Sequence, residues 1–133
     1  MPHIAIIEDE PDISNLLGHC FTCEGFRVTI AHDGPAGLDI VRRLGPDLVI
    51  LDLFLPHLSG WEVFDSLKAG EETRAIPVVV LSANGDVANR ISLLEAGADD
   101  YIVKPCSMRE VVARSRAVLR RTVQVAHTRG GNT

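Results

Sequence analysis

Six polar side chains stand directly after short apolar runs of this 133-residue chain, and their chemistry suits a metal ion and a phosphoryl group. Carboxylate oxygens are the ligands that Mg²⁺ prefers, and carboxylates gathered in one place repel one another until a cation joins them. An aspartate beside such a cation can act as a nucleophile toward phosphorus. An ammonium group and a hydroxyl group across the site can then hold the phosphoryl oxygens. In chain order the six side chains are those of Glu8, Asp9, Glu10, Asp52, Ser82 and Lys104.

The apolar runs that precede these side chains indicate β-strands. A continuous apolar run such as Leu48–Leu51 predicts a strand that is covered on both faces. Between residues 24 and 32 apolar and polar residues alternate instead, which predicts a strand with one wet face, nearer the edge of a sheet. The expected strands are central at about 4–8, 48–52 and 77–82, near the edge at 26–31, and shorter at 101–103.

Helical patterns fill the segments between the strands. In residues 12–24 the apolar positions follow the i, i+3, i+4 spacing of an amphipathic helix, and Gly25 suits the helix end. Five alternating strand–helix pairs predict a parallel sheet with helices on both faces and right-handed crossovers. Ligands bind such a sheet at the carboxyl ends of its strands, so we expect the six polar side chains to share that edge. The expected helices cover 12–24, 35–44, 60–69, 87–96 and 107–121.

Each of these side chains also has an ordinary explanation when it is taken alone. The acids after the first strand could favour the dipole of the following helix, and Ser82 could cap a helix. Lys104 could be a solvated loop residue. Asp52 is harder to explain in this way, because it adjoins a buried strand. The shared placement at the same end of successive strands favours a common site.

The motifs around these side chains resemble those of the receiver domain of two-component response regulators. The resemblance covers about residues 3–121, with four motifs in the family's order on five strand–helix units. It implies the flavodoxin-like doubly wound (βα)5 parallel sheet with strand order 2-1-3-4-5, in which the second strand lies at an edge. The motifs are Ile6-Ile7-Glu8-Asp9-Glu10-Pro11, Leu51-Asp52-Leu53 with Leu55-Pro56 and Gly60, Leu81-Ser82-Ala83, and Gly97-Ala98-Asp99-Asp100-Tyr101-Ile102-Val103-Lys104-Pro105.

The resemblance implies a role for each site residue. Asp52 would be the phosphoacceptor, which takes a phosphoryl group from a phosphohistidine of a sensor histidine kinase. Lys104 would pair with that group and Ser82 would hydrogen-bond to it, while Tyr101 turns inward as Ser82 moves. A cis peptide bond would precede Pro105. Because phosphorylation adds about −1.5 to −2 charges that Lys104 and Ser82 contact in only one conformer, it shifts the population of two conformers. The resemblance also implies Mg²⁺, held by Glu8, Asp9, Asp52 and the backbone carbonyl of Phe54.

The last predicted helix adds a finer resemblance. Residues 108–121 are similar to the fifth helix of the OmpR/PhoB branch, whose activated receivers form homodimers through the fourth helix, fifth strand and fifth helix. A solvated, charge-laced helix is the ordinary alternative, and we favour the dimer face. The matching charged positions are Arg90 with Glu110, Asp100 with Arg114, and Glu95 or Asp99 with Arg121.

Members of this branch usually continue into a winged-helix DNA-binding domain. We therefore expect a receiver domain over residues 1–121 and a linker or flexible tail over 122–133, with DNA contact only through a further domain. The formal net charge of −5 argues against nucleic acid as the direct partner of this domain. No apolar run reaches the roughly 18 residues of a membrane span, and the first residues do not resemble a secretory signal. We expect a cytoplasmic protein without a membrane partner, whose output is control of transcription.

Two other classes of function fail at named residues. A haloacid-dehalogenase-like phosphatase needs a second aspartate two residues after its nucleophile, and Phe54 stands there. A flavodoxin-like nucleotide binder needs a glycine-rich phosphate cradle after the first strand, and residues 8–11 read Glu-Asp-Glu-Pro instead. We therefore expect a phosphoacceptor with only its own phosphorylation and dephosphorylation chemistry, not a turnover enzyme.

Cys20 and Cys23 form a Cys-x-x-Cys pair, a spacing that occurs in redox and zinc sites. No second Cys/His pair accompanies it in the sequence, and Cys20 falls on the apolar stripe of its predicted helix. The sequence therefore favours a packing role for these two cysteines.

Overall fold

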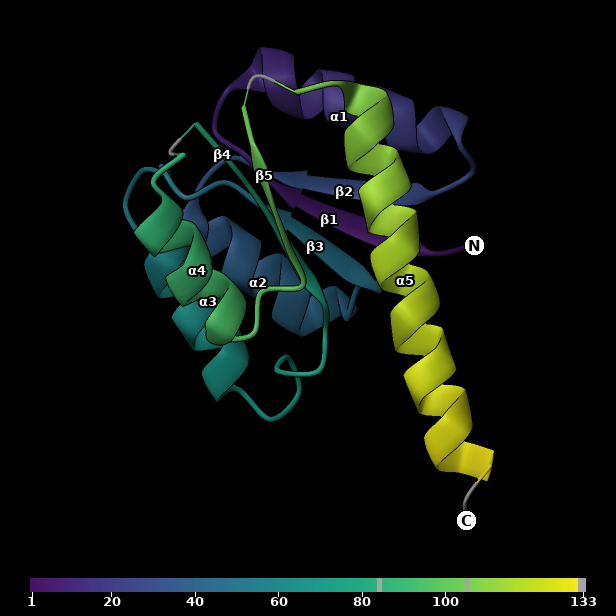
Figure 1. The fold of residues 1–133 in the computed structure, drawn as a ribbon. Coiled ribbons are helices and arrows are strands. Elements are labelled where there is room, and N and C mark those ends of the chain that lie inside the picture. Colours follow the sequence, from purple (N-terminus) through teal and green to yellow (C-terminus); the bar gives the residue numbers. More distant parts are fainter. Residues whose placement is uncertain (84, 105, 132–133) are drawn as a thin grey trace.

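The computed structural model describes residues 1–83, 85–104 and 106–131, with side chains described through residue 122. Strands and helices alternate along the chain (Figure 1). Pro105, for which the resemblance implies a cis peptide bond, lies outside the described residues. The elements are β1 (His3–Ile7), α1 (Pro11–Cys23), β2 (Arg27–Ala31), α2 (Gly34–Leu44), β3 (Leu48–Leu51), α3 (Gly60–Ala69), β4 (Val78–Ser82), α4 (Val87–Glu95), β5 (Asp100–Val103) and α5 (Met108–Gly131).

The strands form one parallel sheet in the order β2-β1-β3-β4-β5, which confirms the predicted fold class. The continuous apolar runs became β3 and β4, where every residue is buried. The alternating segment became β2, an edge strand whose first residue, Arg27, is exposed. Because β1 pairs with β2 on one side and β3 on the other, the strand order reverses beside β1. That reversal places the ligand-binding edge of the sheet at the ends of β1 and β3.

Helices cover both faces of the sheet (Figure 1). Side chains of α2, α3 and α4 pack with one set of strand residues, including Ile7 and Val49. Side chains of α1 and α5 pack with the opposite set, including Ile6 and Ile50. Successive strand residues point to opposite faces, so each central strand contributes to both apolar clusters. The two clusters hold the strand ends in fixed positions relative to one another.

The residues at the start of α1 and α3, the two helices nearest the expected site, are of types that favour a helix start. Pro11 occupies the first turn of α1, where its missing N–H costs no hydrogen bond. At α3, the Ser59 side chain accepts a hydrogen bond from the backbone N–H of Glu62, and the Glu62 side chain accepts one from the backbone N–H of Ser59. This capping box fixes where the loop after β3 turns into α3.

Helix α5 continues to Gly131, ten residues beyond Arg121, where the apolar pattern predicts its end. Each residue added to an existing helix gains a backbone hydrogen bond, so a helix can run on past its apolar face. In Figure 1 the last part of α5 extends past the sheet. The assignment of residues 122–133 as a linker between domains stays a prediction, and the side chains from residue 123 onward lie outside the described part.

Candidate functional site

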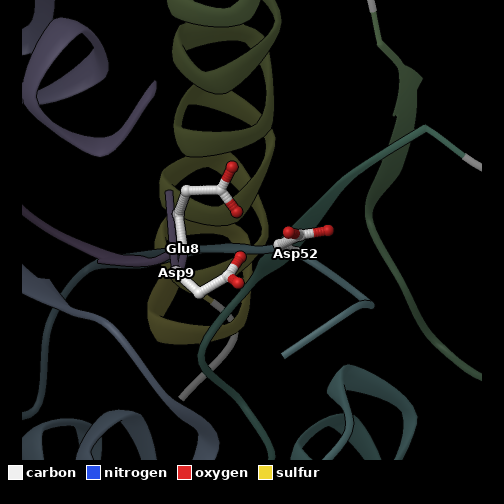
Figure 2. A group of neighbouring side chains, drawn as sticks. All are labelled: Glu8, Asp9 and Asp52. Carbon is white, nitrogen blue, oxygen red and sulfur yellow. The ribbon is translucent and has the colours of Figure 1, made fainter. Parts of the chain in front are cut away.

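Three carboxylates meet at the carboxyl ends of β1 and β3 (Figure 2). Glu8 and Asp9 follow β1 directly, and Asp52 follows β3. Ile7 pairs with Leu51 in the sheet, so the residues that follow these two strands are neighbours in space. One oxygen from each of the three carboxylates lies within 4.8 Å of the others. The predicted acidic cluster is therefore present, with a spacing that suits a shared cation.

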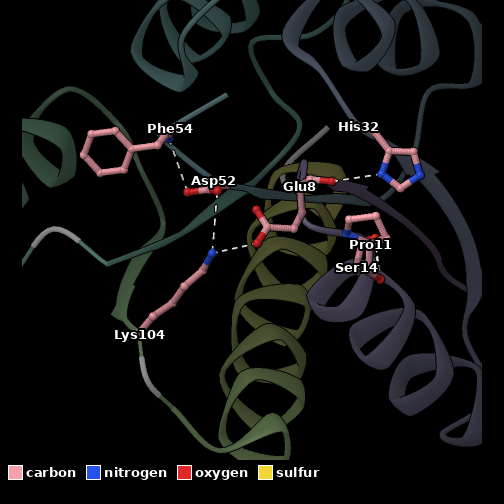
Figure 3. Close-up of polar contacts among 7 residues, drawn as sticks. All are labelled: Glu8, Pro11, Ser14, His32, Asp52, Phe54 and Lys104. Carbon is pink, nitrogen blue, oxygen red and sulfur yellow. Dashed lines mark hydrogen bonds and ion pairs between the residues drawn. The ribbon is translucent and has the colours of Figure 1, made fainter. Parts of the chain in front are cut away.

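Lys104 reaches this cluster from the end of β5 (Figure 3). Its Nζ lies 2.6 Å from Oε1 of Glu8 and 3.5 Å from Oδ2 of Asp52. The backbone N–H of Lys104 donates a 2.8 Å hydrogen bond to the carbonyl of Ser82, which ties the end of β5 to the end of β4. One ammonium group thus faces three carboxylates, so the cluster keeps a negative surplus.

The buried carboxyl group of Glu8 has unusual electrostatics. Its residue is only 2% exposed, and burial, with Asp52 adding to the effect, raises the pKa of Glu8 to about 8 although Lys104 works to lower it. Burial works to lower the pKa of the Lys104 ammonium, but the hydrogen bond to Glu8 and the charge of Asp52 outweigh burial and raise it. Lys104 is therefore charged at neutral pH. A second cation near Glu8 would favour its ionised form as well.

Asp52 is held in place by the loop that follows it. The carboxylate is nearly buried, and its Oδ1 accepts a 3.3 Å hydrogen bond from the backbone N–H of Phe54 while Oδ2 faces Lys104. Figure 3 shows the Phe54 ring turned away from Asp52. That ring packs edge-on against Trp61, with 5.5 Å between centroids, and is 55% exposed. Access to Asp52 is therefore not closed by the Phe54 ring.

The two residues expected to switch are buried near this edge. Ser82 is the last residue of β4 and is fully buried. Tyr101, in β5, is 4% exposed and packs in the same apolar cluster as Leu93 of α4. Ser82 pairs with Val103 in the sheet, directly before Lys104. These positions agree with the expected placement, and their switching roles stay predictions.

Several charged residues of the expected dimer face have partners within the chain. Arg114 lies 3.3 Å from the Asp100 carboxylate and 3.1 Å from the Glu110 carboxylate. Arg121 donates a 3.3 Å hydrogen bond to the backbone carbonyl of Asp99. Arg90 and Glu95 lie on α4, and their pairing with Glu110 and Arg121 stays a prediction.

Sequence reasoning missed two contacts that frame the site. His32, directly after β2, has its Nδ1 3.2 Å from the backbone carbonyl of Glu8. Trp61 of α3 donates a 3.1 Å hydrogen bond from Nε1 to the Asn89 side chain of α4, 28 residues away in sequence. Neither pair falls at a helical or strand spacing, so the sequence offered no local signal for them.

None of the helices in the described part of the chain has the length and apolarity that a membrane crossing requires.

Curated proteins that are similar to this chain include transcriptional regulators. The chain is 42% identical over 125 residues to the DNA-binding dual master transcriptional regulator RpaA of Synechocystis, a match that covers 94% of this chain and 52% of that protein. It is 44% identical over 122 residues to the phosphate regulon transcriptional regulatory protein PhoB of Rhizobium meliloti, covering 91% of this chain and 53% of the relative. The chain thus spans about half the length of these curated relatives.

A solved structure and a family model agree with these relatives. The receiver domain of the Francisella response regulator 1452 superposes with a TM-score of 0.86 at 29% identity, covering 92% of this chain and 99% of that one. The family model of the response regulator receiver domain matches residues 4–116. The resemblance to the OmpR/PhoB branch is likewise confirmed by the PhoB match. The chain belongs to the family of response regulator receiver domains.

Proposed function

We propose that Asp52 accepts a phosphoryl group from a phosphohistidine of a sensor histidine kinase, and that the resulting conformational change controls an output, transcription, in the cytoplasm. The observation that supports this best is the environment of the Asp52 carboxylate. It is nearly buried, 3.5 Å from the Lys104 ammonium, and within one small cluster with Glu8 and Asp9. The Asp52 carboxylate thus lies beside the Lys104 ammonium and belongs to a candidate metal-binding set.

A magnesium ion fits this cluster. Oε2 of Glu8 is buried and finds no hydrogen-bond partner among the described residues, as expected of an oxygen that serves a cation. The proposed ligands are Glu8, Asp9, Asp52 and the backbone carbonyl of Phe54, an oxygen-only set that suits Mg²⁺. Bound there, the ion would neutralise charge on the carboxylates and on the phosphoryl oxygens.

In the proposed transfer, one carboxylate oxygen of Asp52 attacks the phosphorus. The oxygen–phosphorus bond forms while the phosphorus–nitrogen bond of the phosphohistidine breaks, and the imidazole nitrogen keeps the electron pair. Lys104 binds a phosphoryl oxygen, and the Ser82 hydroxyl donates to another. Because the Lys104 ammonium contacts Glu8 before transfer, at 2.6 Å, the phosphoryl group competes with Glu8 for it. That competition gives the switch two states.

A small phosphoryl donor tests this proposal. We expect incubation with acetyl phosphate and Mg²⁺ to add one phosphoryl group per chain, seen in the intact mass, and hydroxylamine to remove it because an acyl phosphate reacts with that amine. Donor consumption is expected to stop near one equivalent, apart from slow turnover of the acyl phosphate. The proposal would be wrong if no adduct formed, or if the chain hydrolysed many donor molecules per minute as a phosphatase does.

Mg²⁺ binding is expected to change the fluorescence of Trp61, the only tryptophan of the chain. The Phe54 ring packs on Trp61, and the backbone N–H of Phe54 donates a hydrogen bond to Asp52. A movement of the Asp52 carboxylate would therefore change the surroundings of the indole. A Mg²⁺ titration should give a saturable change that EDTA reverses. Asp9→Asn should weaken the response strongly. Asp39→Asn, an exposed acid of α2, should leave it unchanged. A similar response in both variants would contradict this site.

Homodimer formation through α4, β5 and α5 is the proposed output step. On phosphorylation, Arg114 would exchange its contact with Asp100 for Asp100 of a second copy, and Glu110 would leave Arg114 for Arg90 of that copy. We expect Arg114→Glu to weaken the phosphorylated dimer at least about tenfold, since like charges across an interface cost several kcal/mol. Light scattering after size exclusion measures this. The control is Arg43→Glu, which reverses the charge of an exposed residue of α2 that pairs with Asp39. This variant should leave the dimer intact. Equal loss in both variants would contradict the assigned face.

A further inference from the structure

We propose that the junction of α1 and α5 holds a second metal site, for monovalent copper, formed by His19, Cys20 and Cys23 of α1 and Met108 of α5. This inference goes beyond the phosphoryl switch and does not depend on it. It takes up the Cys-x-x-Cys pair, which the sequence alone assigned to packing. The structure adds two donors to that pair that its spacing did not reveal.

The first observation is a preformed pair of donor atoms. Sγ of Cys23 and Nε2 of His19 lie 3.5 Å apart, one helical turn from each other. In zinc sites, sulfur at about 2.3 Å and nitrogen at about 2.0 Å, at a tetrahedral angle, lie about 3.5 Å from each other, and this spacing is the guide for a site with the same ligand types. Both residues are exposed, so a metal ion can reach them from solvent. The two atoms are within hydrogen-bond distance in this structure, and the same separation fits two ligands of one metal ion.

The second observation is the pocket that these residues line. His19, Cys20, Cys23 and Met108 all border one open pocket of about 260 Å³ between α1 and α5. Thiolate and thioether sulfurs are soft donors that favour monovalent copper over the hard cations magnesium and calcium, and imidazole also binds copper. The carboxylates at the end of β1 offer only oxygen, so the two sites select different metals. Three sulfur donors and one imidazole, from two separate helices and in one pocket, are the basis of the copper assignment.

Charge in the pocket also fits this occupant. Two thiolates around a monovalent ion leave one negative charge, and Arg109 lines the same pocket. The Glu24 carboxylate, another lining group, already pairs with Arg116 at 3.1 Å. The Arg109 guanidinium can therefore balance the negative charge of a thiolate site. The Glu24 carboxylate, which could otherwise compete as a ligand, is paired with Arg116.

Closure of the site needs side-chain rotation. Among the described His, Cys, Asp and Glu residues, only Glu8, Asp9 and Asp52 have three donor atoms within 4.8 Å of one another. His19 and Cys23 are thus the starting pair, and Cys20, half-buried at the edge of an apolar cluster, must turn toward them. The Met108 thioether sits on an unbranched, adaptable side chain that can follow.

Copper competition under anaerobic, reducing conditions tests the proposal. The full chain is titrated with monovalent copper against bicinchoninate, a coloured chelator of that ion. We expect the chain to withdraw one copper ion per monomer, with sulfur ligands in the X-ray absorption spectrum. Cys20→Ser with Cys23→Ser should weaken binding by at least about 100-fold, since loss of even an outer partner of a metal ligand costs about 10–100-fold. Met108→Leu should weaken it less.

The third cysteine supplies the matched control. Cys106 is half-buried and lines a different cavity, so Cys106→Ser should bind copper as the unmodified chain does. Circular dichroism and phosphoryl uptake from acetyl phosphate should be the same in all variants, which separates metal loss from unfolding. Equal weakening in Cys106→Ser, undiminished binding in the double variant, or tighter binding of Zn²⁺ than of copper would each overturn the assignment.

Discussion

Asp52→Asn is expected to abolish phosphoryl uptake from acetyl phosphate while making the metal-free protein harder to unfold. The amide has nearly the shape of the carboxylate but no nucleophilic anionic oxygen, so no adduct should appear in the intact mass. Asp52 shares its cluster with two other carboxylates and a single ammonium group. Without a metal, the nearly buried Asp52 charge lies close to Asp9, helps to raise the pKa of Glu8 to about 8, and shares its one nearby ammonium group with Glu8. Removal of the Asp52 charge should therefore raise the free energy of unfolding, on the order of 1 kcal/mol.

Urea unfolding in EDTA and in Mg²⁺ measures the second half of this prediction. In EDTA the variant should unfold at higher urea than the unmodified chain. Addition of Mg²⁺ should raise the free energy of unfolding of the unmodified chain more than that of the variant. The reason is that a ligand that binds only the folded state stabilises that state by mass action. Asp39→Asn removes an exposed acid and should change stability by less than about 0.5 kcal/mol without affecting uptake. A stoichiometric adduct on Asp52→Asn, or a clear loss of metal-free stability, would refute this account.

Gly60→Ala should be among the most destabilising single substitutions in the chain. A methyl group at Gly60 would overlap the carbonyl oxygen of Asp52 and the Cα of Leu53, both backbone atoms that cannot rotate away. The Gly60 N–H also donates a 2.8 Å hydrogen bond to the Leu53 carbonyl, and α3 begins at this residue. We expect a loss of about 3 kcal/mol or more, at the upper end for overpacking. Relief of the overlap would displace Asp52, so phosphoryl uptake should fall too.

The matched control for this prediction is Gly85→Ala. There the nearest atom to an added methyl group is a side-chain carbon of Val103 at 3.5 Å, an ordinary contact. Urea midpoints of the two variants should differ widely, with Gly85→Ala close to the unmodified chain. Similar midpoints would show that the turn between β3 and α3 can widen at little cost.

The strands and the gathering of polar groups could be predicted because their causes are local. A strand covered on both faces needs apolar residues at every position, and β3 shows this pattern in sequence. Parallel strands then bring their carboxyl ends to one edge, which predicts Asp52 beside Glu8, where the structure has it. The order of the strands came from the family resemblance. The apolar periodicity of the sequence shows which strand has a solvent-exposed face, but it does not show which strands are neighbours.

Pairings between distant residues were out of reach of the same reasoning. Lys104 was expected beside Asp52, yet its closest contact is Glu8, 96 residues away, because the buried carboxyl group there competes for the ammonium. The His19–Cys23 pair falls at a helical spacing, but its approach to Met108 depends on how α1 and α5 pack. Side-chain choices of this kind depend on burial and packing across elements, which no short sequence window contains.

The length of α5 has a mechanical consequence. A helix of 24 residues measures about 36 Å at 1.5 Å per residue, and its first turn begins four residues after Lys104. A tilt of about 10° at that turn would move the far end by about 6 Å. Such a tilt would turn a small rearrangement of charge near Asp52 into a displacement of several ångströms at Gly131, as a lever arm does.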